Sequence, residues 1–384
     1  MIENNVYSTF SIPCHDIANV VEFAPYEWCS TLLAVGTNSR VSIYQCVFDQ
    51  EKEEPDGEEF EWRSIFDFQN GFRVTSISWC PETTFMTREK EDFIRFAIGG
   101  SDKKIKIVSA NLKGDNSCQI CEGHTDFINS IAYIPDTAGE LVSTGDDNTL
   151  RLWNKEGEQQ GCFQLSAPGM SVCVHEREPG KVIVAQKNGI IKIFSLALQR
   201  QIMSLDCCQA PLMSADWSYM NEDFVVAACG TEWLIFQMSR SSQPLERRQA
   251  HTEGCKHVKW ARNQQTLLAT SGRPGRQIKV FSTRHHQVRC FIVREPVDQS
   301  IQYQTSSGKM FNNKGNSRQT LLATSGRPGK QIKVFSTRHH QMPLSTTLQV
   351  AYGMSWHQRI PALAIGGDKQ VHVYLLQTAR SQPS

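Results

Sequence analysis

A pattern of short strands recurs along the chain about every forty residues. Each copy has an alternating strand, a turn, a second apolar strand, a Gly/Asp/Asn turn and a third strand, most clearly from Gly123 to Asn154. The third strands end near residues 44, 108, 153, 194, 236, 281 and 374, and four of the six steps between them are 41 to 45 residues. A four-stranded blade of a WD-type repeat has this length. The period therefore predicts an all-β chain, residues 1–384, folded as a single seven-bladed WD-repeat β-propeller.

The two ends of the chain receive different predictions. Tyr7–Ile12 is short and strand-like and precedes the first full blade. We expect it to close the ring as the outer strand of the last blade, because closure removes an open sheet edge. Residues 375–384 form a polar tail that is poorly suited to that position.

The longest step, from residue 281 to residue 374, contains a near-perfect duplication. Gln265–Gln287 and Gln319–Gln341 differ only in having Arg276 or Lys330, whereas the other copies share little identity. Three explanations of this identity stay open: a recent tandem duplication, a duplicated exon, or an error in the gene model. We predict that one copy forms half of the sixth blade. Residues 288–341 are then a suspect duplicated insertion, because half a blade cannot bury both of its faces.

Composition excludes several classes of protein. The 40 basic and 39 acidic residues give a net charge of +1, so the whole chain is not a general binder of polyanions. No apolar run approaches the roughly 18–20 residues of a membrane helix, so no integral membrane segment is predicted. The N-terminal residues lack the pattern of a signal peptide. The 13 Cys are scattered, which favours reduced thiols in the cytosol or nucleus.

The third repeat carries a polar set at the spacing that WD-repeat blades use for a buried hydrogen-bond relay: His124, Ser143, Asp147 and Trp153. Buried polar groups must be paired, and a complete set fixes the turn and the strand register. A catalytic dyad of His124 and Asp147 is the alternative interpretation, but the repeat context favours a structural relay. No other copy contains all four residues.

Other reactive residues give weaker signals. Cys118 and Cys121 precede His124 but lack the second Cys pair of a structural zinc site. Cys207 and Cys208 are expected to pack as small apolar side chains. His285–His286 and their copy, His339–His340, are expected in solvated loops. With no nucleophile elbow, phosphate loop, metalloprotease or kinase motif, we predict no catalytic, cofactor-binding or metal site and no small-molecule substrate, and partner-binding residues are left unassigned.

Charge is unevenly distributed along the chain. Asp49–Glu61 has eight acidic residues and one Lys, and is interpreted first as a solvated insertion and second as a docking site for a basic partner. Lys256–Ser345 has sixteen basic and two acidic residues. Such a region could contact nucleic acid, but four of its charges belong to the duplicate copy and no aromatic-basic interleaving is present. Direct nucleic-acid binding is therefore disfavoured.

Nine short segments occur in order from the first blade to the last, and two of them, EGHTDFIN and PGMSVC, are far more specific than the repeat pattern. They are VVEFAP at Val20–Pro25, EGHTDFIN at Glu122–Asn129, PGMSVC at Pro168–Cys173, KNG at Lys187–Gly189, PLMSA at Pro211–Ala215, Trp233–Ile235, Ser239–Ser242, Ser355–His357 and IGGD at Ile365–Asp368. These segments resemble the small WD-repeat nucleoporins of the Y-shaped outer-ring complex of the nuclear pore. The match spans most of the chain outside the acidic stretch and the duplicated region.

The resemblance implies a non-catalytic scaffold subunit of the nuclear pore. Such a subunit docks on the helical part of a larger propeller-plus-solenoid nucleoporin and supports pore assembly, mRNA export and protein import. In animal cells its complex also appears at kinetochores in mitosis. Two alternatives stay open. A ubiquitin-ligase substrate receptor is the first, although Trp153-Asn154-Lys155 lacks the usual Trp-Asp-x-Arg box. A nucleic-acid-binding propeller that uses residues 256–345 is the second.

Overall fold

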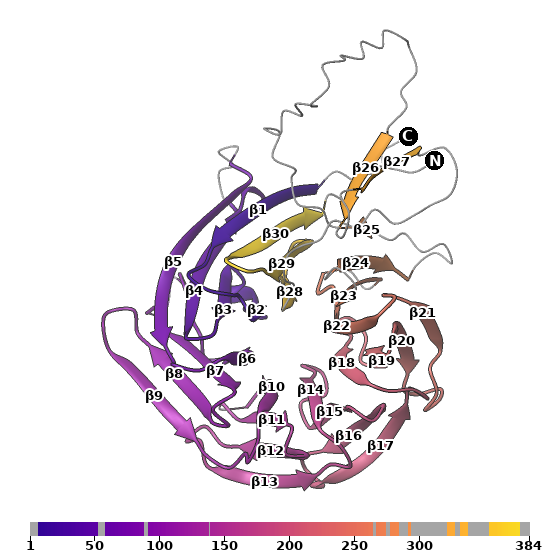
Figure 1. Cartoon of the computed structure of the whole chain (residues 1–384). Helices are drawn as coiled ribbons and strands as arrows, with labels where there is room; N and C mark the ends of the chain where they lie inside the picture. The colour runs from indigo at the N-terminus through magenta and orange to yellow at the C-terminus, as the bar shows by residue number, and fades with distance from the viewer. Residues whose placement is uncertain are drawn as a thin grey trace, which may run out of the picture.

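The computed structural model describes residues 7–52, 58–87, 91–137, 139–263, 266–273, 277–283, 291–292, 321–326, 331–336 and 353–376. Seven four-stranded antiparallel sheets surround a central axis (Figure 1). The predicted seven-bladed β-propeller is therefore confirmed. Within the described residues the helical segments are two 3-10 helices, η1 (Glu27–Cys29) and η2 (Asp49–Glu51).

The first four blades follow one another along the chain. Blade 1 contains β2 (Val20–Phe23), β3 (Leu32–Gly36), β4 (Arg40–Phe48) and β5 (Phe60–Gln69). Blade 2 contains β6 (Val74–Trp79), β7 (Ile94–Gly100), β8 (Ile105–Ala110) and β9 (Asn116–Cys121). Blade 3 contains β10 (Ile128–Tyr133), β11 (Leu141–Gly145), β12 (Thr149–Trp153) and β13 (Gln159–Gln164). Blade 4 contains β14 (Gly169–Val174), β15 (Lys181–Gln186), β16 (Ile190–Ser195) and β17 (Arg200–Asp206).

The remaining blades complete the circle. Blade 5 contains β18 (Leu212–Trp217), β19 (Phe224–Cys229), β20 (Glu232–Gln237) and β21 (Glu246–Gln249). Blade 6 contains β22 (Gly254–Trp260), β23 (Leu267–Arg273), β24 (Gln277–Ser282) and β25 (Phe291–Ile292). Blade 7 contains β28 (Met354–Trp356), β29 (Ala362–Gly366), β30 (Gln370–Leu376) and β1 (Tyr7–Pro13). A further hairpin, β26 (Leu321–Gly326) and β27 (Gln331–Ser336), is a separate two-stranded sheet.

The ring is held together by apolar layers between neighbouring blades. Each of seven buried clusters joins two adjacent sheets, including one between blades 7 and 1 that contains Ile12, Phe23 and Phe48. The second strands β3, β11 and β29 are buried at every position because a neighbouring blade covers each of their faces. On β8 alternate residues face opposite neighbours, so Ile105 and Ile107 pack in the cluster between blades 2 and 3, whereas Val108 packs in the cluster between blades 1 and 2.

The N-terminal strand closes the circle as expected. β1 pairs antiparallel with β30, with Phe10 opposite Val373 and Ile12 opposite Val371. The inner strand β28 contacts both β22 and β2, so blade 7 lies between blades 6 and 1. β30 continues to Leu376, which corrects the expected start of the polar tail at residue 375. Residues 377–384 lie outside the described residues.

The first copy of the duplicated segment forms the middle of blade 6. β23 and β24 lie between β22 and β25, and Val280 is opposite Phe291. The boundary of the suspect insertion is thus corrected, because Phe291 and Ile292 supply the outer strand of the sixth blade. The second copy supplies β26 and β27, with Leu321 opposite Ser336. Residues 293–320 and 337–341 lie outside the described residues.

Candidate functional site

The four residues of the predicted relay come together in blade 3. The ring nitrogens of His124 lie 2.7 Å from Asp147 Oδ2 and 2.7 Å from Ser143 Oγ, and Trp153 Nε1 donates a hydrogen bond of 2.8 Å to the same hydroxyl oxygen. His124 precedes β10, Ser143 lies on β11, Asp147 lies in the β11–β12 turn, and Trp153 ends β12. One chain of hydrogen bonds therefore joins the segment before β10 to the β11–β12 hairpin.

Asp147 is the best-satisfied member of the relay. Its carboxylate also accepts hydrogen bonds from the Thr149 hydroxyl group at 2.7 Å and from the Thr125 backbone at 3.2 Å. Burial by itself raises the pKa of Asp147, but hydrogen bonds from His124 and Thr149 outweigh burial and lower the pKa to about 2. Asp147 is thus ionised at neutral pH and fixes the turn as a charged acceptor.

The relay is enclosed within the blade. The side chains of His124 and Asp147 are 1% and 2% exposed, and Trp153 is buried between blades 2 and 3. A catalytic dyad must reach a substrate, whereas this pair faces the hydroxyl of Ser143 and the indole of Trp153. The geometry favours the structural interpretation.

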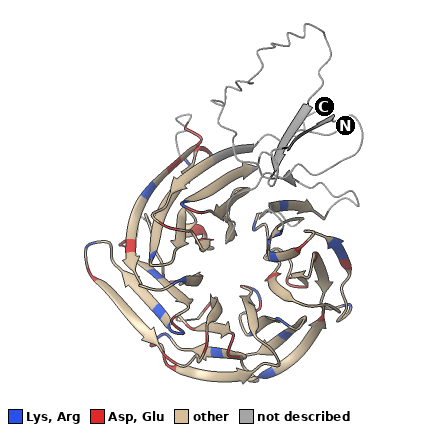
Figure 2. Cartoon of the chain, in the orientation of Figure 1, with Lys and Arg blue, Asp and Glu red and all other residues tan. Residues whose placement is uncertain are grey.

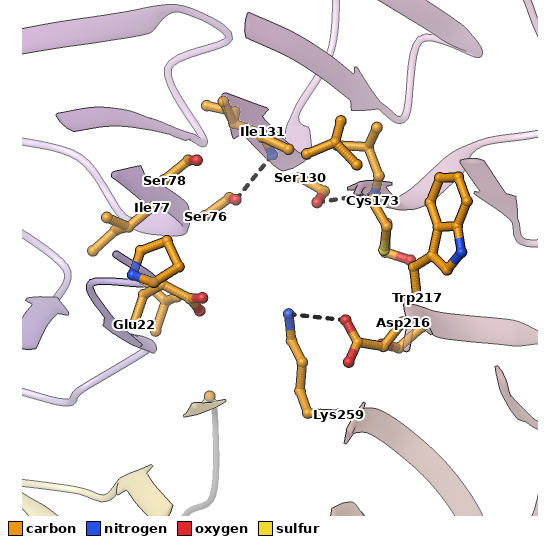
Figure 3. A pocket seen from close by; sticks show the side chains of 18 of the residues that line it. Glu22, Ser76, Ile77, Ser78, Ser130, Ile131, Cys173, Asp216, Trp217 and Lys259 are labelled. Atoms are coloured by element: carbon orange, nitrogen blue, oxygen red, sulfur yellow. Dashed lines mark hydrogen bonds and ion pairs between the residues drawn. The ribbon is translucent and has the colours of Figure 1, made fainter. Parts of the chain in front are cut away.

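The inner strands of the blades enclose a central cavity of about 240 Å³. In blades 1 to 6, the residue that precedes the last position of the inner strand, or its equivalent, contributes to one layer of the cavity wall (Figure 3). From blade 1 to blade 6 this layer contains Glu22, Ser78, Ala132, Cys173, Asp216 and Lys259, and Ser355 is the equivalent in blade 7. The segments PGMSVC and PLMSA supply β14 and β18, so both are wall strands of this channel.

Polar side chains of the wall bind the backbone of the next blade. Ser76, Ser130 and Ser171 accept hydrogen bonds from the backbone N–H groups of the following inner strand at 2.9–3.1 Å. Asp216 Oδ2 accepts from Trp260 N at 2.8 Å, and Ser355 Oγ accepts from Phe23 N at 3.0 Å. Inner strands have no partner strand on the axial side, so these contacts satisfy backbone donors that would otherwise need water.

Three charged residues lie together in the channel. Lys259 Nζ is 3.8 Å from Asp216 Oδ1, and Glu22 extends toward the same space (Figure 3). Burial lowers the pKa of Lys259, but Asp216 and Glu22 outweigh burial and raise it above the usual range. Burial raises the pKa of Glu22, and Lys259 opposes this change. The channel is therefore an internally compensated charge cluster, with no described group placed as a nucleophile.

Sequence reasoning did not find this charged layer. The available signal is a polar residue directly before the aromatic residue of an inner strand, as in Glu22-Phe23, Asp216-Trp217 and Lys259-Trp260. The aromatic side chain packs between blades, so strand alternation turns its polar neighbour toward the axis.

The burial of the two cysteine pairs singled out from the sequence is only partly as expected. Cys121 is buried and Cys118 is exposed on β9, an outer strand. Cys207 is buried as expected, but Cys208 is exposed because the chain turns there with a φ of 56°. Among the described residues no group of three or more His, Cys, Asp or Glu is placed to hold a metal ion. His285–His286 and His339–His340 lie outside the described residues.

The acidic stretch is not solvated along its whole length. Asp49–Glu51 forms η2, and the Glu51 side chain is only 8% exposed, with Oε1 3.6 Å from Nε2 of the buried His357. Burial raises the pKa of Glu51 and lowers the pKa of His357 to about 3. The start of the stretch is therefore packed at the junction of blades 1 and 7, which corrects the interpretation as a wholly solvated insertion.

Comparison with known proteins identifies the family. Residues 115–154, around blade 3, match the model of the WD domain, G-beta repeat. The chain is 33% identical to nucleoporin Nup37 of Homo sapiens over 366 residues, which cover 95% of each chain. It is 32% identical to Nup37 of Mus musculus over the same shares, and 24% identical to Nup37 of Drosophila melanogaster over 98% of this chain and 97% of that protein. The chain belongs to the Nup37 family of WD-repeat nucleoporins.

Proposed function

We propose that this chain is a non-catalytic scaffold subunit of the outer-ring, Y-shaped subcomplex of the nuclear pore. It docks on a larger propeller-plus-solenoid nucleoporin and contacts other subunits of that complex. In this role it supports pore assembly and, through it, mRNA export and protein import. It resides at the nuclear envelope in interphase and accompanies its complex to kinetochores in mitosis.

The observation that carries the proposal is the extent of the similarity. The alignment to the human nucleoporin covers 95% of both chains, so it includes all seven blades and not a single WD repeat. A propeller by itself does not specify function. Similarity across the whole ring, in contrast, extends to the loops and faces that contact partners.

The non-catalytic part of the proposal is supported by the geometry of the polar groups. His124 and Asp147 are enclosed within blade 3, and Lys259 and Asp216 are paired in the channel. No helix among the described residues is long and apolar enough to cross a membrane.

The described basic residues of the 256–345 region give little support to nucleic-acid binding. Lys259 pairs with Asp216 inside the channel, Lys279 Nζ donates to the Ala250 carbonyl oxygen, and Arg262 lies over the Tyr219 ring. Basic and acidic residues both occur all around the described ring (Figure 2). Binding of a phosphate backbone needs basic side chains free on one surface.

Affinity purification from nuclear-envelope extract tests the proposal. The chain carries a tag at its natural expression level, and half of each sample is treated with RNase. Recovery of outer-ring nucleoporins, unchanged by RNase, is expected. Recovery of cullin adaptors would instead support a ligase receptor, and RNase-sensitive partners would support nucleic-acid binding. In mitotic cells the same tag is expected at kinetochores, and exclusion from them would remove that part of the proposal.

A further inference from the structure

One end of the propeller is formed by the connections between the inner and second strands of the blades. These connections are residues 24–31, 80–93, 134–140, 175–180, 218–223, 261–266 and 357–361. We call their described part the AB face. Turns between the third and outer strands, such as 196–199, lie at the same end because antiparallel strands alternate direction.

Among the described connections between strands, exposed large apolar side chains occur mainly at this end, whereas others are exposed on the outer strands β5, β9 and β17. Trp28 is 48% exposed, Met86 64% and Met220 41%, all on the AB face, and Leu198 in the 196–199 turn is 59% exposed. Among the described connections at the opposite end, Phe127 is the one large apolar residue with comparable exposure, at 46%. Grouped exposed apolar side chains mark interaction sites more often than scattered ones.

Contacts with neighbouring residues fix two of these side chains in their exposed positions. Trp28 stacks on Tyr26 with ring centroids 5.1 Å apart, and its Nε1 donates to the Thr83 carbonyl oxygen at 2.7 Å. Met86 Sδ accepts a hydrogen bond from Gln45 Nε2 at 3.0 Å, and the Met86 backbone, with a φ of 53°, donates to Asp92 Oδ1 at 2.6 Å. A left-handed backbone at a non-glycine residue is unfavourable by itself and is kept where the surroundings impose it. Both side chains thus stay exposed at the boundary of blades 1 and 2.

The charge of the AB face specifies the kind of partner. Its described connections contain ten acidic and three basic residues. The acidic residues are Glu27, Glu82, Glu91, Asp92, Asp136, Glu140, Glu176, Glu178, Glu222 and Asp223. Ion pairs with Arg95, Lys113, Lys181 and Arg177 compensate four of them. The excess of carboxylates around exposed apolar groups complements a segment that carries both basic and apolar side chains.

We propose that the AB face is the docking face of this subunit and that it binds a basic, apolar-bearing segment of the larger nucleoporin. Trp28, Met86 and Met220 provide the apolar anchors, because aromatic and Met side chains are enriched at protein interfaces and Trp is frequent among the residues that carry most binding energy. Glu27 and Glu176 are exposed at the same face and provide the counter-charge. The inference rests on the proposed function, since it names the surface through which that partner is held.

The test compares variants of the two ends of the full-length chain in the nuclear-envelope purification. Trp28→Ala, Met220→Ser and Glu27→Lys change the AB face. Phe127→Ala and Glu253→Lys are matched controls at the opposite end, where Glu253 is exposed in the connection before β22. Thermal melting verifies that each variant is folded. Met220 is 41% exposed and makes no hydrogen bond or ring contact with the part of the chain that the structure describes, so its replacement has little reason to disturb the blade.

A zero-length carbodiimide cross-linker tests the chemistry of the partner, because it joins carboxylates to lysines in direct contact. We expect the AB variants to lower recovery of outer-ring nucleoporins at least fivefold, the controls to recover them as the unmodified chain does, and cross-links to join Glu27 or Glu176 to partner lysines. If the AB variants recover outer-ring nucleoporins as well as the unmodified chain does, or if only the control variants lose them, the AB face is not the docking face. The proposed function is unaffected by either result. Failure of the unmodified chain to recover nucleoporins would overturn both.

Discussion

His251 Nε2 lies 3.0 Å from the hydroxyl oxygen of Thr270 in blade 6, as His124 Nε2 lies 2.7 Å from Ser143 Oγ in blade 3. Blade 6 lacks the rest of the relay, because Phe281 occupies the position on β24 that Trp153 occupies on β12. Burial and, to a smaller extent, the neighbouring Lys279 lower the pKa of His251 to about 4, against an opposing hydrogen bond with the Thr270 backbone. His251 is thus buried as a neutral ring.

This burial predicts that acid destabilises the fold through His251. A His with a lowered folded pKa contributes its full stability above the unfolded pKa of about 6.5 and loses it as pH falls toward 4. From pH 7.5 to pH 5 the loss is about 2 kcal/mol. His251→Gln cannot titrate, so its free energy of unfolding should fall less over that range by a similar amount. Urea denaturation at both pH values measures this, and identical pH profiles would contradict it.

The relay of blade 3 predicts a large effect from a small change. Ser143→Ala removes the acceptor of Trp153 Nε1 and the partner of His124, which leaves buried polar groups unsatisfied. We expect a loss of about 2–3 kcal/mol in the free energy of unfolding. Ser117→Ala, at an exposed position of the outer strand β9, should change it by less than about 0.5 kcal/mol. Equal effects of the two variants in chemical denaturation would show that the relay does not stabilise the blade.

Ring closure by β1 depends on the apolar side chain of Ile12. Ile12 is fully buried in the cluster between blades 7 and 1. Ile12→Ala should destabilise the fold by about 3 kcal/mol, because it leaves a cavity between two sheets. Ser11→Ala on the exposed side of the same strand is the matched control. Equal changes in the free energy of unfolding for the two variants, measured by chemical denaturation, would contradict closure of the ring by β1.

The channel cluster predicts a compensating pair of substitutions. Lys259→Met removes the cation next to Asp216 and Glu22, and should cost about 1 kcal/mol, since the Lys259 side chain is 35% exposed to the channel. Adding Glu22→Gln should recover part of that loss, because Glu22 then no longer needs the positive charge. Lys187→Met, at an exposed turn, is the control. Strictly additive losses in the double variant would show that Glu22 and Lys259 do not interact.

The sequence predicted the structure best where the spacing of residue types along the chain is compatible with one arrangement only. The strand period located the blades, and the spacing of His124, Ser143, Asp147 and Trp153 brought together the residues that hydrogen-bond. The channel charges were not foreseen, because alternation tells which residues share a face but not whether that face meets the axis or the solvent. Glu51 and Cys208 were misplaced for a local reason: a 3-10 helix turns Glu51 inward, and a left-handed residue turns Cys208 outward.

Imaging of the chain at the nuclear envelope tests the central claim most directly. The endogenous chain is tagged and observed beside a tagged outer-ring nucleoporin in living interphase cells. A scaffold subunit should give a punctate nuclear rim in which both tags coincide at each pore with a constant ratio and exchange slowly after photobleaching. A diffuse nucleoplasmic signal, or a rim signal that varies independently of the outer-ring nucleoporin, would contradict the assignment.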